Sequence, residues 1–158
     1  MSLDGRELRN ALGRFATGVT VITTHNAQGE AVGMTANSFS SVSLDPALVL
    51  WCLQNNSDMY ETFASPTSFA INVLALEQEE ISNFYAKKGD HLMDPAHFSI
   101  GRNGAPLLRN ALVSFECTLD AAHEGGDHLI IVGKVEDMVS RPTGQPLLFH
   151  SGRYAEIR

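Results

Sequence analysis

Alternating apolar and polar positions dominate the second half of the chain and predict strands there. In Leu112–Ala121, apolar residues at every second position alternate with Ser114, Glu116 and other polar residues, a period of two that is typical of a half-buried strand. The segment His128–Val139 follows after the turn-like Glu124–Asp127. The pattern therefore predicts a long hairpin.

Shorter runs rich in β-branched and apolar residues predict further strands along the chain. They are Val19–Thr24, Ala31–Thr35, Ala47–Leu53, Ser68–Leu74, Leu147–His150 and Tyr154–Ile157. Ala47–Leu53 is apolar on both faces, which is typical of a central strand. The Ser-rich stretch Asn37–Leu44 alternates only weakly and ends at Asp45–Pro46.

Three segments have helical spacing. The first is Asp4–Thr17, where Asp4 is a candidate N-cap and Leu8, Leu12 and Phe15 share one face. The others are Asp58–Ala64, in which Asp58 and Glu61 are spaced like a capping box, and Glu77–Tyr85. The segment Lys87–Asn110 is predicted as a long irregular loop, and loops of this length are usually functional or mobile.

Many strands with a few short helices between them predict a mainly β fold, an antiparallel barrel with peripheral helices. No strand is followed by a Gly-rich phosphate fingerprint and no βαβ rhythm exists, which excludes a Rossmann fold. A length of 158 residues predicts a single domain over residues 1–158.

Composition argues against several classes of protein. The formal net charge is −7 and only Lys87–Lys88 forms a basic pair, so nucleic-acid binding is not expected. No run of about 20 uncharged apolar residues predicts a membrane span, and Met1–Arg9 does not resemble a secretory signal. Cys52 and Cys117 are far apart in the sequence and are expected to be buried free thiols. We therefore predict a reduced, cytoplasmic protein.

Neither a nucleophile nor a metal site is predicted. No serine lies in a G-x-S-x-G motif, and the six histidines lack the spacing of H-E-x-x-H or other metal motifs. The chain therefore offers no group for which a catalytic role is expected.

Three polar segments are candidates for ligand binding. Gly33–Ser43 gathers small hydroxyl and amide side chains, which let a planar ligand approach the backbone, although a self-satisfied Ser-rich loop explains it as well. Cys52–Ser57 leads from a strand to a helix N-terminus, which suits a phosphate or plain helix capping. His128 follows a hairpin turn, where it is either idle in solvent or faces a ligand.

Five segments in the same order resemble the flavin reductase family, the small components of two-component flavin monooxygenases. They are Phe15–Thr24, Gly33–Pro46, Phe69–Leu74, Gly126–His128 and the closing Pro146–Phe149 with Gly152–Tyr154. The resemblance implies an antiparallel split β-barrel of the FMN-binding type.

The resemblance also implies site residues. The stretch Thr35, Ala36, Asn37 and Ser38 matches the part that holds the isoalloxazine ring and the ribityl chain, with Ser41 and Ser43 near the same site. Cys52, Gln54 and Ser57 match the part that meets the ribityl-phosphate region, and Phe84, Lys87 and Lys88 match a segment near the flavin. His128 and Tyr154 match the nicotinamide side. No residue is assigned as catalytic or as a metal ligand.

The chain departs from the family pattern at two places. Ala96-His97-Phe98 stands where members often have an Arg-Phe pair, which puts an arginine contact there in doubt. Ala47 stands where a second proline often follows Asp45–Pro46.

The implied activity is hydride transfer from NADH or NADPH to FMN or FAD, which supplies reduced flavin to a partner oxygenase. Members of the family are usually homodimers with each flavin site near the subunit interface. Two other functions stay open: an electron carrier with tightly bound FMN, and a flavin-binding module without catalysis.

Overall fold

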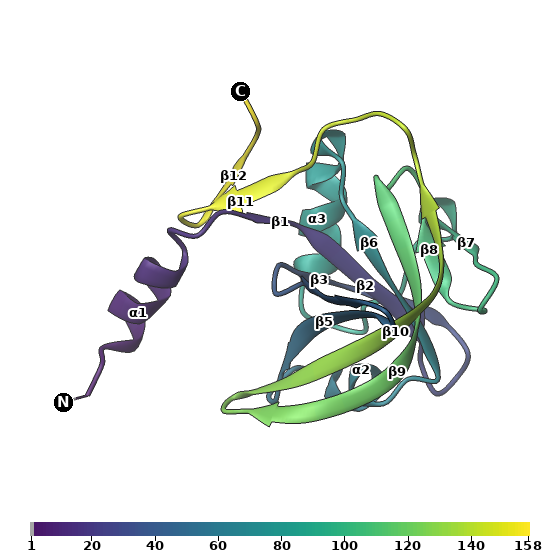
Figure 1. The fold of residues 1–158 in the computed structure, drawn as a ribbon, viewed down its shortest axis with the longest axis horizontal. Helices are drawn as coiled ribbons and strands as arrows, with labels where there is room; N and C mark the ends of the chain where they lie inside the picture. Colours follow the sequence, from purple (N-terminus) through teal and green to yellow (C-terminus); the bar gives the residue numbers. More distant parts are fainter. Residues whose placement is uncertain (1) are drawn as a thin grey trace.

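The computed structural model describes residues 2–158 and is built mainly from antiparallel strands (Figure 1). The helices are α1 (Gly5–Leu12), α2 (Tyr60–Ala64) and α3 (Glu79–Ala86), with 3₁₀ turns η1 (Leu76–Gln78) and η2 (Pro95–His97). The strands are β1 (Thr17–Gly18), β2 (Thr20–His25), β3 (Ala31–Ala36), β4 (Ser40–Leu44), β5 (Ala47–Gln54), β6 (Ser68–Val73), β7 (Phe98–Ile100), β8 (Pro106–Leu108), β9 (Val113–Gly125), β10 (His128–Ser140), β11 (Leu148–His150) and β12 (Arg153–Ala155). The predicted mainly β class is confirmed.

One seven-stranded sheet, in the order β3-β2-β6-β9-β10-β5-β4, forms the body of the molecule. The long hairpin β9–β10 that the sequence predicted is confirmed. Its turn consists of the two residues Gly126 and Asp127. Gly126 has φ +68°, a left-handed conformation that glycine adopts without strain in such turns. Strand β5 lies between β10 and β4, as its two apolar faces predict.

The main core lies along the inner face of this sheet. Trp51, Phe63, Phe69 and Ile71 are at most 2% exposed and pack together with other apolar residues. Burial of each such side chain stabilises the fold by about 1.5–3 kcal/mol. The alternate apolar positions of the sequence are therefore the ones that build the core.

Asn72 ties the middle of the sheet together from within. Its amide donates to the Val21 carbonyl at 2.9 Å and to the Thr23 hydroxyl at 3.0 Å. Its oxygen accepts from the Leu108 N–H and the Ser114 hydroxyl. Because all four hydrogen bonds are made, this fully buried side chain fixes β6 against β2, β8 and β9.

The N-terminal segment differs from its prediction. Asp4 caps α1 as expected, but the helix ends at Leu12 rather than near Gly18, since Gly13 and the following turn end it. Helix α1 buries no residue and projects away from the sheet (Figure 1). The residues after it, Thr17 and Gly18, form β1 on the separate sheet β1-β11-β12.

Two further predictions are wrong. Helix α2 begins at Tyr60, and Asp58 does not cap it; the Asp58 carboxylate instead binds Gly89 and His91. The segment Lys87–Asn110 is not irregular throughout, because it contains η2 and the small β7–β8 hairpin. Three-residue strands are too short to show a period in the sequence.

No helix within residues 2–158 is long and apolar enough to cross a membrane.

Candidate functional site

A cavity of about 1200 Å³ lies between the α1 segment, the β11–β12 turn and the end of the β9–β10 hairpin. Four residues that the sequence predicted for the site line it together: Asn37, Ser38, Cys52 and His128. The residues between β3 and β4 therefore meet β5 and the hairpin end at one cavity, although they are far apart in the sequence.

Ser38 joins the β3–β4 connection to β5. Its hydroxyl donates to the Cys52 carbonyl at 3.1 Å and accepts from the Cys52 N–H at 2.9 Å. Strand β4 pairs with β5 only as far as Leu50, so the Ser38 side chain continues this pairing beyond the end of β4. The hydroxyl is consequently used within the protein, and only the Ser38 backbone remains to bind a ligand.

The backbone at Asn37 and Ser38 has unused donors. Within residues 2–158, the N–H groups of Asn37 and Ser38 donate to no acceptor. Such groups bind the polar edge of a planar ring without a side chain between ring and backbone. This pair of donors beside an apolar cavity wall fits the pyrimidine edge of a flavin.

Cys52 forms part of that wall. Burial raises the pKa of its thiol, so the side chain stays uncharged at neutral pH. It is a free thiol, as is Cys117, whose pKa is raised to about 12, chiefly by burial. Both are free thiols, as expected from the sequence, but Cys117 alone is buried as expected, while Cys52 is partly exposed.

His128 is oriented by its neighbour. Its Nδ1 lies 2.7 Å from Asp127 Oδ1, and the hydrogen bond from the ring lowers the pKa of the Asp127 carboxyl. Because the carboxylate accepts a hydrogen bond from Nδ1–H, Nε2 is the ring atom left for a ligand. Gln54 lies opposite His128 on the neighbouring strand.

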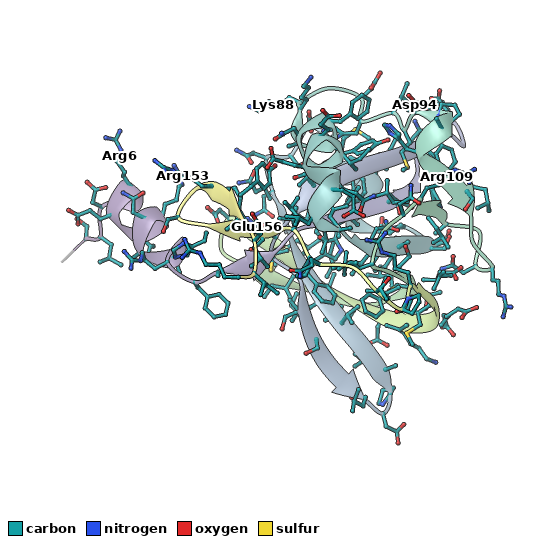
Figure 2. The ribbon with its side chains drawn as sticks, turned by 90° about the horizontal axis from the view of Figure 1, so that it is seen from above. Arg6, Lys88, Asp94, Arg109, Arg153 and Glu156 are labelled. Carbon is teal, nitrogen blue, oxygen red and sulfur yellow. The ribbon has the colours of Figure 1, made fainter. Side chains whose placement is uncertain are left out.

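A second group of predicted residues gathers at the other end of β3. The Ser57 hydroxyl lies 3.9 Å from Met34 Sδ, and Asp58 accepts from the Gly89 N–H at 2.7 Å. Asp58 therefore holds the segment after α3, which carries Lys87 and Lys88, against the turn that carries Ser57. Figure 2 places Lys88 at the outer surface beside α3.

Thr35 and Tyr154 both contact α3. The Thr35 hydroxyl donates to the Ser82 carbonyl at 2.7 Å. The Tyr154 hydroxyl donates to Asn83 Oδ1 at 3.0 Å and lies 2.6 Å from Ser82 Oγ. Tyr154 does not line the cavity with His128; its ring packs on Phe149, which does.

The remaining predicted residues lie apart from the cavity. Phe84 is 45% exposed on α3 and packs edge-on against Tyr85 and His97. Ala36 is the last residue of the edge strand β3 and pairs with Thr20 of β2. Ser41 and Ser43 are on β4, the outer strand of the sheet, on either side of a register shift.

Sequence reasoning missed three groups that the structure brings to the site. Arg9 and Arg14 line the cavity from the segment around α1, and Phe149 lines it from β11. His91 bridges Gly33 and Asp58 at the other end of β3. Of these residues, Phe149 alone had a signal in the sequence, because it lies in Pro146–Phe149, a segment that resembles the family.

Known proteins are similar to this chain over most of its length. The family model described as "Flavin reductase like domain" matches residues 12–158. The FMN reductase (NADH) SmoA of Agrobacterium fabrum is 44% identical over 154 residues, which cover 98% of this chain and 87% of that protein. The reductase component of the flavin-dependent trigonelline monooxygenase of Acinetobacter baylyi is 44% identical over 135 residues.

A solved structure extends the likeness to the whole fold. The NADH:FAD oxidoreductase SgcE6 of Streptomyces globisporus, in complex with NAD and FAD fragments, has a TM-score of 0.91 and 36% identity. The match covers 100% of this chain and 97% of that one. The Acinetobacter reductase component is longer, and 85% of this chain spans 44% of it. The family model and these likenesses run over nearly the whole chain, which therefore belongs to the flavin reductase family.

Proposed function

We propose that the protein is an NAD(P)H:flavin oxidoreductase that transfers hydride from NADH or NADPH to FMN or FAD. The observation that carries this proposal is the cavity itself. It brings the free N–H groups of Asn37 and Ser38 to the same space as the free Nε2 of His128. The two N–H donors suit a flavin edge, and Nε2, which accepts a hydrogen bond in the neutral ring, suits the NH₂ of a nicotinamide carboxamide.

A bound flavin supplies the chemistry, since its N5 accepts the hydride from nicotinamide C4. The residues of the chain bind the flavin and the nicotinamide and orient the two rings. The N–H groups of Asn37 and Ser38 favour negative charge at the ring edge, because N–H groups without an acceptor in the protein can stabilise an anion there. The Cys52 thiol is neutral, so it does not repel negative charge on the flavin ring. Phe149 excludes water, and His128, held by Asp127, orients the nicotinamide.

The phosphate end of the flavin belongs at the second group. Ser57, Lys87 and Lys88 offer a hydroxyl and two exposed ammonium groups on segments that Asp58 holds together. Ser41, Ser43, Gln54, Phe84, Thr35 and Ala36 complete the proposed flavin side, and Tyr154 supports the nicotinamide side through Phe149. Arg9 and Arg14 add positive charge to the cavity, which suits the phosphates of a nicotinamide dinucleotide.

A homodimer is the proposed assembly. Leu8, Leu12 and Phe15 around α1 are 43%, 66% and 79% exposed, and a lone helix of eight residues is marginal without packing. Leu12 and Phe15 also line the cavity, so a second copy that covers this segment closes the site. Trp51 and Phe63, in contrast, belong to the core of the single chain.

The dimer has a direct test. We expect Leu12→Asp to shift the protein to half its mass in sedimentation velocity while circular dichroism stays unchanged, because the charge lies on the exposed face of α1. Leu3→Asp, before the helix, is the control. A wild-type protein that sediments as a monomer contradicts the dimer.

The further parts of the proposal follow from the family. Residues 1–158 act as one domain, and the curved sheet is a split barrel of the FMN-binding type, in which Ser38 links the β3–β4 connection to β5. Reduced flavin passes to a partner oxygenase. Two free cysteines suit a reducing compartment such as the cytoplasm.

The test is NADH oxidation at constant protein concentration with increasing free FMN, repeated with NADPH and FAD. A rate that saturates with added flavin is expected. A single reduction of a bound flavin with no effect of added flavin supports an electron carrier instead. Flavin binding without any response to NADH or NADPH supports a module without catalysis.

A further inference from the structure

The His91 ring lies between two acceptors. Its Nδ1 is 3.0 Å from the Gly33 carbonyl oxygen, and its Nε2 is 3.2 Å from Asp58 Oδ1. The His91 carbonyl in turn accepts from the Gly33 N–H at 2.9 Å. The ring is only 4% exposed, and the residue has φ +56°, a left-handed conformation that is uncommon outside glycine.

Both hydrogen bonds can form together only in the protonated ring. A carbonyl oxygen and an ionised carboxylate accept hydrogen bonds and donate none, whereas a neutral imidazole has a single N–H. The pKa of Asp58 is lowered, first by the Gly89 N–H and further by His91, so this carboxyl is ionised at neutral pH. Loss of the ring proton would therefore set a nitrogen lone pair against the carboxylate.

This contact joins two segments of the proposed phosphate end. Asp58 directly follows Ser57, and its second oxygen accepts from Gly89 at 2.7 Å, directly after Lys87 and Lys88. His91 fixes the far end of the same loop to β3. Backbone hydrogen bonds hold the end of the loop to β3, from Gly33 to His91 and from Met93 to Ala31, while the Asp58 carboxylate and the His91 ring hold the part nearer Lys88.

Few other charges lie on the segments around the ring. Strand β3 presents the uncharged Gly33 backbone, and its residues Ala31–Ala36 carry no ionisable group. From α3, Tyr85 is neutral because burial raises its pKa to about 12. The charged groups on the turn before α2, on α2 itself and on the loop are Asp58, Glu61, Lys87, Lys88 and Asp90. Asp58 alone of these is hydrogen-bonded to the ring.

We propose that His91 is a positioning residue whose protonated ring holds the Lys87–Gly89 loop in place to bind the phosphate of the flavin. This inference rests on the proposed function for the location of the phosphate. It predicts that the His91 ring strengthens binding of FMN, which carries a phosphate, and has no effect on binding of riboflavin, which carries none.

The protonation state can be measured without any flavin. Long-range proton–nitrogen correlations of the histidine rings in the free protein, assigned with His91→Gln, are expected to show a proton on both His91 nitrogens, because each nitrogen faces an acceptor. A His91 ring with a single N–H overturns the inference, whatever the protein does with NADH.

The binding consequence is measured by flavin fluorescence titration. We expect His91→Gln to weaken FMN about tenfold, the size of one lost hydrogen bond to a charged group, with riboflavin unchanged.

Asp58→Asn is the matched second variant. Its amide oxygen can accept from Gly89, and its NH₂ can donate to Nε2 of a ring whose Nδ1–H donates to Gly33, so the contacts persist and its affinity for FMN is expected to stay near that of the wild type. Equal FMN affinity in wild type and His91→Gln overturns the inference. So does an equal loss of FMN and riboflavin, which indicates general damage. Absence of NADH oxidation in the wild type contradicts only the proposed reductase activity.

Discussion

The two ends of the proposed flavin site are built in different ways. At the ring end, Asn37, Ser38 and Cys52 lie at the ends of sheet strands, and a serine side chain continues the pairing of β4 with β5. At the phosphate end, Ser57 and Lys88 lie on loops that are joined by the Asp58 and His91 side chains. The ring end thus depends on backbone hydrogen bonds that pH does not change, whereas the phosphate end depends on two ionisable groups.

This difference separates two kinds of failure. Damage at the ring end should lower stability and weaken every flavin. Damage at the phosphate end should leave the sheet intact and weaken only flavins that carry a phosphate.

Removal of the Ser38 hydroxyl should have the largest effect. Ser38→Ala leaves the N–H and C=O of Cys52 without their partner, so we expect the free energy of unfolding to fall by about 2 kcal/mol. Riboflavin and FMN should lose affinity together. Urea unfolding measures the free energy of unfolding, and fluorescence titration measures the affinities for riboflavin and FMN. Ser40→Ala is the control, because the Ser40 hydroxyl binds only the adjacent Ser41 carbonyl in an exposed position. Loss of FMN binding alone would contradict the ring-end assignment.

Replacement of His128 should affect the nicotinamide and neither end of the flavin. We expect His128→Asn to raise the KM for NADH about tenfold with the Kd for FMN unchanged, since one hydrogen bond to the nicotinamide is lost. Steady-state kinetics measure the KM for NADH, and flavin titration measures the Kd for FMN. His123→Asn, an exposed histidine on β9, is the control. A changed FMN Kd with an unchanged KM would place His128 on the flavin instead.

Lys88 should contribute a smaller, screened attraction at the phosphate end. Because its side chain is exposed, we expect Lys88→Gln to weaken FMN by about two- to threefold at low salt, and by less at high salt. Riboflavin binding should not change. Lys134→Gln on β10 provides the matched loss of charge. An effect that persists at high salt would indicate a buried contact in place of the exposed one.

The smallest effect concerns stability against acid. Hydrogen bonds from Gly89 and His91 lower the pKa of Asp58 below its ordinary 3.8, so the folded state favours the ionised carboxylate. This contribution is present above the ordinary pKa and is lost as the pH falls through the lowered value. Solvent reaches a side chain that is 37% exposed, so we expect less than about 1 kcal/mol.

Urea unfolding of the wild type and Asp58→Asn measures this contribution. The difference in unfolding free energy between them should shrink between about pH 6 and about pH 3. Asp120→Asn, an exposed carboxylate on β9, should show no such change. A difference that grows toward acid pH would contradict the sign.

The sequence predicted the regions whose residues carry a period. Alternation located β9 and the apolar run located β5, because burial on one or both faces of a strand gives a regular sequence pattern. The turn after β9 located β10 as the returning strand of the hairpin. The strands β1, β7 and β8 were missed because two or three residues carry no period. Helix α1 was predicted too long, since its apolar spacing continues to Phe15 although the backbone turns at Gly13.

The prediction of the site residues succeeded and failed for the same reason. Asn37, Ser38, Cys52 and His128 were found through motifs next to strands and do line one cavity. Asp58 was assigned to a helix cap because a short-range pattern fits it, while its real partners are 31 and 33 residues away in the chain. Contacts of that kind between loops leave no local signal, which explains why His91 was not predicted.

The most direct test is a crystal structure of the protein with FMN. The two-ended site predicts the pyrimidine edge of the ring on the N–H groups of Asn37 and Ser38, with the phosphate within hydrogen-bond distance of Ser57 or Lys88. FMN bound with its phosphate in the cavity beside His128, or at a place that contacts neither group, would contradict it.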